Sequence, residues 1–187
     1  MDKLSVGDVL YHASYTEIKD ISLDMCISGK DFGKGFYLTK SLMQAEAFVK
    51  STIKRAKVNG IIGSDVNFGY INMYHITSLD GINEFDFHNA DIMWLHYVAG
   101  NRKNSLFPDE ILRLKKYNVI GGKIANDKTA ATLNLYLDFA YGTPGDEKAD
   151  KACIDFLLPD RLDNQYCFKT NESITKLKFV GCSKVQL

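Results

Sequence analysis

The order of hydrophobic patterns along the chain constrains its fold more than any other feature. Short runs rich in aromatic and β-branched residues, which are typical of strands, lie near both ends of the 187 residues. Helical periodicity dominates between them, with apolar side chains at spacings of three and four in Leu42, Ala45, Val49, Ile53 and Ala56. This order predicts an α+β fold with an antiparallel or mixed sheet, because alternating strands and helices would be expected for a parallel one.

The expected elements follow from these patterns. Strands are predicted at 9–14, 36–39, 70–76, 118–122, 164–170 and 176–185. Helices are predicted at 42–59, 90–106, 109–116, 127–141 and 149–158. Ser41 and Gln44 have the spacing of a capping box at the first helix. No repeat or Pro/Gly/Ser-rich linker divides the chain, so we expect one domain over residues 1–187 with a helical insertion at about 85–160.

Charge and cysteine usage exclude several classes of protein. The 23 basic and 23 acidic residues give no net charge, whereas a generic nucleic-acid binder needs a basic excess. The four cysteines form no C-x-x-C pair, so no zinc site is predicted and reduced thiols are expected. The first 30 residues contain no apolar core of a secretory signal, and no apolar run is long enough to span a membrane. We therefore expect a cytoplasmic protein with no membrane partner.

Two local features are candidates for a binding site. Gly33 and Gly35 lie in a loop before a predicted strand, but their spacing matches neither a P-loop nor the dinucleotide fingerprint. They either form a tight turn or allow the backbone to approach a ligand closely. His12, in the first predicted strand, could bind a ligand hydroxyl or make a structural hydrogen bond. For the other three histidines, a satisfied core or surface position is the simpler interpretation.

Several segments, taken in order, resemble a known family. Leu10-Tyr11-His12-Ala13-Ser14, the segment 30–39, Trp94-Leu95-His96-Tyr97-Val98 and Asn164-Gln165-Tyr166-Cys167-Phe168 are similar to an uncharacterised bacterial domain family. That family is grouped with ADP-ribosyltransferases of the diphtheria-toxin and poly(ADP-ribose) polymerase type. The resemblance extends over nearly the whole chain. It implies an ADP-ribosyltransferase-like split mixed β-sheet core with a helical insertion.

The resemblance also implies roles for individual residues. His12 would hold the adenosine-side ribose of NAD, Tyr37 would stack on nicotinamide, and Gln165 would orient the reacting ribose. Further NAD contacts are implied for the small residues near them: Ala13, Ser14, Gly33 and Gly35. The implied activity is mono-ADP-ribosyl transfer from NAD, with release of nicotinamide and no metal. The acceptor would be a protein, a nucleic acid end or a small molecule.

Gln165 stands where the resembled transferases most often have Glu. A carboxylate there stabilises the positive charge that builds on the ribose as nicotinamide leaves, and Gln supplies no such charge. Asp163, two residues earlier and on the same strand face, could supply it. Arg102, Asn126 and Asp127 could contact the acceptor or the NAD phosphates. Alternatively, Arg102 could pair with an acidic residue and Asp127 could cap the helix that follows.

Two alternatives stay open beside transfer. The chain could be a non-catalytic module of the same fold that binds NAD or an ADP-ribosylated ligand. It could also be a toxin-like effector that a small, antitoxin-like partner protein neutralises. Among the 21 Phe and Tyr residues, most are expected in the core, and Tyr37 is the one that we assign to the site.

Overall fold

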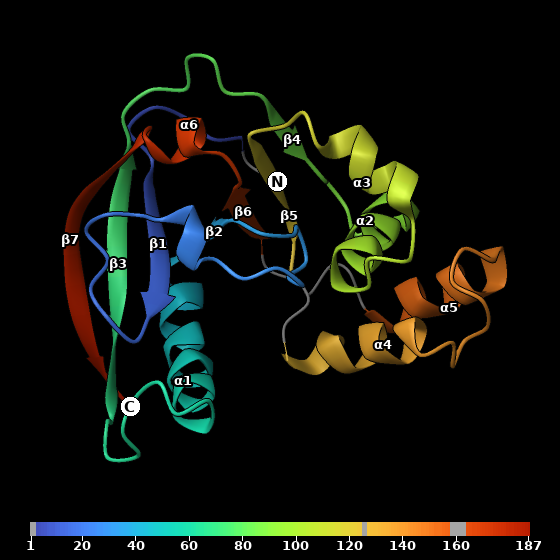
Figure 1. Cartoon of the computed structure of the whole chain (residues 1–187), viewed down its shortest axis with the longest axis horizontal. Coiled ribbons are helices and arrows are strands. Elements are labelled where there is room, and N and C mark those ends of the chain that lie inside the picture. Colours follow the sequence, from blue (N-terminus) through green and yellow to red (C-terminus); the bar gives the residue numbers. More distant parts are fainter. Residues whose placement is uncertain (1–2, 125–126, 158–163) are drawn as a thin grey trace.

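The computed structural model describes residues 3–124, 127–157 and 164–187 (Figure 1). The strands are β1 (Val9–Ser14), β2 (Phe36–Leu38), β3 (Phe68–Ile76), β4 (Glu84–Asp86), β5 (Val119–Lys123), β6 (Asn164–Phe168) and β7 (Leu177–Gln186). The helices are α1 (Leu42–Val58), α2 (Ile92–Arg102), α3 (Pro108–Leu114), α4 (Asp127–Leu137), α5 (Glu147–Leu157) and the single turn α6 (Asn171–Ile174). A short 3₁₀ turn, Leu23–Met25, follows β1.

The strands form two sheets, which confirms the α+β class. The first sheet has the order β1-β3-β7 and is antiparallel throughout. The second has the order β2-β6-β5-β4 and is mixed, because β4 runs parallel to β5 while the other pairs are antiparallel. A single bridge between Tyr11 and Thr39 brings β1 of the first sheet against the end of β2 in the second.

Helix α1 packs on the first sheet. Its buried residues are Gln44 and the predicted apolar positions after Leu42: Ala45, Val49, Ile53 and Ala56. The predicted capping box is only half formed. The Ser41 hydroxyl accepts the Gln44 backbone N–H at 3.2 Å, but the Gln44 side chain accepts from the Thr39 hydroxyl at 2.6 Å. The Ser41 N–H donates to that same hydroxyl at 3.1 Å, so Thr39 takes the role expected of Gln44.

Helices α2 to α5 gather on the side of the molecule away from α1 (Figure 1). They enclose a core around the fully buried Trp94. Within it, His96 on α2 lies with its Nε2 2.6 Å from a carboxylate oxygen of Asp150 on α5, and the Tyr136 hydroxyl on α4 donates to the other oxygen. The expectation that His96 is a satisfied imidazole is confirmed.

Several element boundaries differ from those predicted. Helix α2 ends at Arg102 and not at residue 106, and α4 ends at Leu137 and not at residue 141. Phe139, with a φ of 64°, lies in the left-handed region just after α4. The three-residue strand β4 and the one-turn helix α6 were not predicted, because elements of three or four residues are too short to show a periodic pattern.

Two further observations concern the cysteines and the helices in the part of the chain that the structure describes. All four cysteines are free thiols, and Cys153 and Cys167 are buried. No described helix combines the length and the apolar character that crossing a membrane requires.

Candidate functional site

His12 is held where the two sheets meet. Its Nδ1 lies 2.8 Å from the backbone oxygen of Tyr37, and its ring stacks on Phe36 with centroids 4.4 Å apart. A carbonyl only accepts hydrogen bonds, so Nδ1 carries the proton and Nε2 is left as an acceptor when the ring is neutral. Burial lowers the pKa of His12, although the bond to Tyr37 opposes this effect. Among the residues that the structure describes, Nε2 has no hydrogen-bond partner, so a neutral ring is suited to accept a bond from a ligand hydroxyl.

Tyr37 is half-buried on the opposite face of β2 from Phe36 and Leu38. The predicted alternation is confirmed, since Phe36 and Leu38 lie in one core cluster and Tyr37 packs against another. Its hydroxyl donates to the Gly33 carbonyl at 2.8 Å and accepts the Phe32 N–H at 2.9 Å. Tyr37 therefore fastens the glycine loop before β2 in addition to presenting a partly exposed ring.

Both glycines of this loop are required by internal packing. Gly33 has a φ of +84°, and a Cβ there would lie 2.6 Å from Oδ1 of Asn101. A Cβ at Gly35 would meet Sγ of Cys167 and would lie 2.8 Å from the backbone oxygen of Phe168. Contacts with Asn101, Cys167 and Phe168 thus explain why this tight turn needs glycine at both positions.

An ion pair clamps the same loop to the C-terminal end of α2. Arg102 donates to one carboxylate oxygen of Asp31, with Nε at 2.8 Å and an Nη atom at 2.6 Å. Asn101 adds a bond from its amide to the Asp31 carbonyl at 3.3 Å. Both charged side chains are largely buried, with 18% and 11% exposed for Arg102 and Asp31. Of the two interpretations of Arg102, pairing with an acidic residue is the one observed.

Strand β6, which pairs with β2, carries the thiol of Cys167 opposite Tyr37 and is followed by the ammonium group of Lys169. Cys167 pairs with Tyr37 across the two strands, and burial raises the pKa of its thiol to about 12. Burial and the neighbouring Cys167 raise the pKa of Tyr37 well above its ordinary value. Just beyond the strand, Nζ of Lys169 donates to the hydroxyl of Tyr97 at 2.7 Å. The raised pKa values keep the Cys167 thiol and the Tyr37 hydroxyl neutral at physiological pH.

Gln165 lies on the same sheet face as Tyr37. It is two residues from Cys167 along β6, so side-chain alternation places Gln165, Cys167 and Tyr37 on one side. Its partner on the adjacent strand β5 is Gly122, which has no side chain that could cover Gln165. Among the described residues, the Gln165 amide has no hydrogen-bond partner.

The remaining predicted residues are placed as follows. The side chain of Ala13 packs against the α1 cluster, so only its backbone is near His12. Ser14 is buried, and its hydroxyl accepts the Thr16 N–H at 3.3 Å. Asn126 and Asp163 lie outside the described residues, and Asp127 is the first residue of α4. His12, Tyr37 and Gln165 thus lie on strands that are joined directly, because β1 meets the end of β2 and β2 pairs with β6.

Sequence reasoning assigned no role to Asp31 or Lys169. Asp31 precedes the glycine loop, and Arg102 was expected to have an acidic partner, but no pattern identified which one. Lys169 follows β6, and nothing in the neighbouring sequence distinguishes it from an ordinary surface lysine. Both contacts join segments about 70 residues apart, and such long-range pairs leave no local signal.

Comparison with known families now identifies the group to which the chain belongs. Residues 9–179 match the model of a family described as "Protein of unknown function (DUF3990)". The chain is a member of the DUF3990 family. No curated protein and no solved structure matches it. The DUF3990 match begins at the first residue of β1 and includes every residue of the site described above.

The pKa of His12 leads to a prediction for this DUF3990 chain. Burial holds the pKa of His12 below 6.5 in the folded chain. As the pH falls through this value, the His12 ring therefore binds a proton in the unfolded chain but stays neutral in the folded chain. The contribution of His12 to the free energy of unfolding should therefore decrease as the pH is lowered from about 7 to about 5, whereas Glu84, whose pKa burial raises to about 7, contributes in the opposite direction. In His12→Gln the contribution of His12 is lost, and urea unfolding at a series of pH values would measure the difference in slope. Equal slopes in the two proteins would contradict a lowered pKa.

A second prediction concerns Gly35. Replacing it with Ala forces a methyl group against the Phe168 carbonyl and the Cys167 thiol, so we expect a loss of about 1–3 kcal/mol in the free energy of unfolding. Gly29→Ala is the matched control in the same loop, because nothing lies within 4 Å of its added Cβ and only its φ of +75° opposes the change. Chemical denaturation of both variants measures the difference. A Gly35→Ala protein as stable as wild type would show that the loop is not packed as described.

Proposed function

We propose that this DUF3990 protein is an NAD-dependent mono-ADP-ribosyltransferase with an ADP-ribosyltransferase-like core. In this proposal NAD lies across β2, where the first and second sheets meet. The Nε2 atom of His12 accepts a hydrogen bond from the adenosine-side ribose. The exposed part of the Tyr37 ring stacks on nicotinamide, and the Gln165 amide holds the nicotinamide ribose.

The observation that carries the proposal is the contact between His12 and Tyr37. The bond of 2.8 Å from Nδ1 to the Tyr37 carbonyl fixes the His12 ring of the first sheet against the backbone of β2 in the second. It also leaves Nε2 as the ring atom available for a hydroxyl. NAD carries ribose hydroxyls from which Nε2 of His12 can accept a hydrogen bond and a flat nicotinamide ring that can stack on Tyr37, so it matches both residues.

Gln165 sets the expected chemistry. The glycosidic bond to nicotinamide breaks with positive charge developing on the ribose, and an amide can hold the ribose hydroxyl without supplying a countercharge. Tyr37 and Cys167 stay neutral and add none. The site should therefore bind NAD in a reactive orientation and hydrolyse it slowly, so that transfer depends on a good nucleophile in the acceptor.

The experiment measures nicotinamide released from NAD by the purified protein, with and without cell lysate. We expect slow release in buffer and faster release with lysate. Gln165→Glu should raise release in buffer by about tenfold or more, because it restores a carboxylate beside the developing charge. Gln44→Glu, at a buried position that contacts Thr39, is the control for an added carboxylate elsewhere.

Two results would contradict the proposal in different ways. If calorimetry shows that NAD binds while no nicotinamide is released under any condition, the chain is a binding module of the same fold. If NAD neither binds nor reacts, the site assignment itself is wrong.

A further inference from the structure

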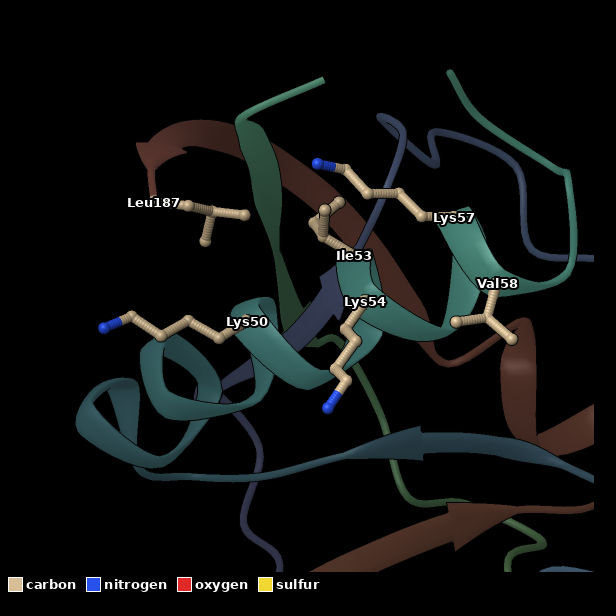
Figure 2. A pocket seen from close by; sticks show the side chains of 6 residues that line it. All are labelled: Lys50, Ile53, Lys54, Lys57, Val58 and Leu187. Carbon is tan, nitrogen blue, oxygen red and sulfur yellow. The ribbon is translucent and has the colours of Figure 1, made fainter. Parts of the chain in front are cut away.

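A hollow lies beside the first sheet, between the second half of α1 and the end of β7 (Figure 2). Its volume is about 450 Å³, and its lining consists of Lys50, Ile53, Lys54, Lys57, Val58 and Leu187. None of these residues belongs to the site around His12 and Tyr37. The hollow therefore requires an explanation separate from the proposed reaction.

The floor and two opposite sides of the hollow are apolar. Ile53 is 1% exposed and closes the bottom, where α1 packs on the sheet. Val58 and Leu187 stand on opposite sides and are 79% and 43% exposed. Aliphatic side chains left this open are suited to cover an apolar side chain of another molecule.

The rim is positively charged. Lys50, Lys54 and Lys57 recur at spacings of four and three along one side of α1, and their ammonium groups extend in different directions around the hollow (Figure 2). Like charges at these spacings destabilise a helix. Within the part of the chain that the structure describes, no ion pair relieves them. A helix with four basic residues and one acidic residue is unbalanced in a chain whose net charge is zero.

We propose that this hollow is a docking surface for an acidic amphipathic segment of a partner protein. An aliphatic side chain of that segment enters between Val58 and Leu187, over Ile53. Its carboxylates approach the three lysines, which gives the charge complementarity that the rim lacks. A nucleic acid would match the lysines but would leave the apolar floor uncovered, so a peptide with an aliphatic anchor is the better fit.

The test uses a labelled synthetic helical peptide of about 16 residues, with Leu every three or four positions and Glu between them. Fluorescence anisotropy with the full chain should show saturable binding that weakens with salt. Changing Lys50, Lys54 and Lys57 together to Glu should weaken binding at least about tenfold. The matched control carries the same charge change at the exposed Lys115, Lys116 and Lys148, and it should bind as wild type does.

The apolar contact is tested separately. Val58→Asp should weaken binding although Val58 is too exposed for the change to disturb folding. A peptide with Gln in place of every Leu, at equal charge, should bind poorly. The proposal is overturned if the Leu peptide does not bind, or if the Gln peptide binds equally well. It is also overturned if a single-stranded oligonucleotide or an anionic vesicle binds this face more tightly and displaces the peptide.

Discussion

Replacing His12 with alanine is expected to lower the rate of nicotinamide release from NAD by about 100-fold. The change removes the hydrogen bond to the Tyr37 carbonyl and the Nε2 acceptor that we assign to the adenosine-side ribose. Because the lost contact lies away from the bond that breaks, its loss acts through the position of NAD in the site. Both NAD affinity and turnover should therefore fall, as calorimetry and an assay of released nicotinamide would show.

The matched control is His75→Ala. His75 lies on β3 of the same sheet, is exposed, and pairs with Val9 of β1 and Lys178 of β7, so its variant should retain wild-type release. Circular dichroism of both variants checks that the sheet is intact. If His12→Ala releases nicotinamide at the wild-type rate, then NAD does not lie against His12.

Breaking the ion pair between Asp31 and Arg102 should have the largest effect on stability. Arg102→Met leaves the Asp31 carboxylate, 11% exposed, without the two charge-assisted hydrogen bonds that Arg102 donates. Removing one partner of a buried pair costs about 3–5 kcal/mol, because the remaining charge stays buried without that partner. We therefore expect a loss near that size in the free energy of unfolding, measured with urea.

The companion variants separate this effect from general damage. Asp31→Asn combined with Arg102→Met removes both charges, and it should be more stable than Arg102→Met alone. Arg113→Met breaks a pair with Glu110 in which the arginine is 54% exposed, so it should cost under about 1 kcal/mol. A cost for Arg102→Met no greater than for Arg113→Met would mean that the loop before β2 is not clamped to α2.

Local patterns in the sequence predicted much of the fold. The apolar spacing of α1 and the strand alternation at Tyr37 both depend on neighbours along the chain, and both are confirmed. The pairing of strands does not depend on neighbours along the chain. That β2 lies beside β6, and β4 runs parallel to β5, follows from contacts between distant segments, and no local pattern specifies them.

The candidate NAD site stays a prediction. His12, Tyr37 and Gln165 were assigned through the resemblance, and the structure brings their strands together. The clamp on the glycine loop could not be derived in the same way. Arg102 was expected to meet either an acidic residue or a phosphate, and only the tertiary fold places Asp31 within reach of its guanidinium.

The proposed transfer is tested most directly by incubating the purified protein with NAD and cell lysate. Mass spectrometry then measures the ADP-ribosyl group on acceptors, and a parallel assay measures released nicotinamide. Wild type should give both products, Tyr37→Phe should retain a substantial share because it keeps the ring, and Tyr37→Ala should give almost none. Absence of both products with wild type, or equal yields from wild type and Tyr37→Ala, would contradict an NAD site built on Tyr37.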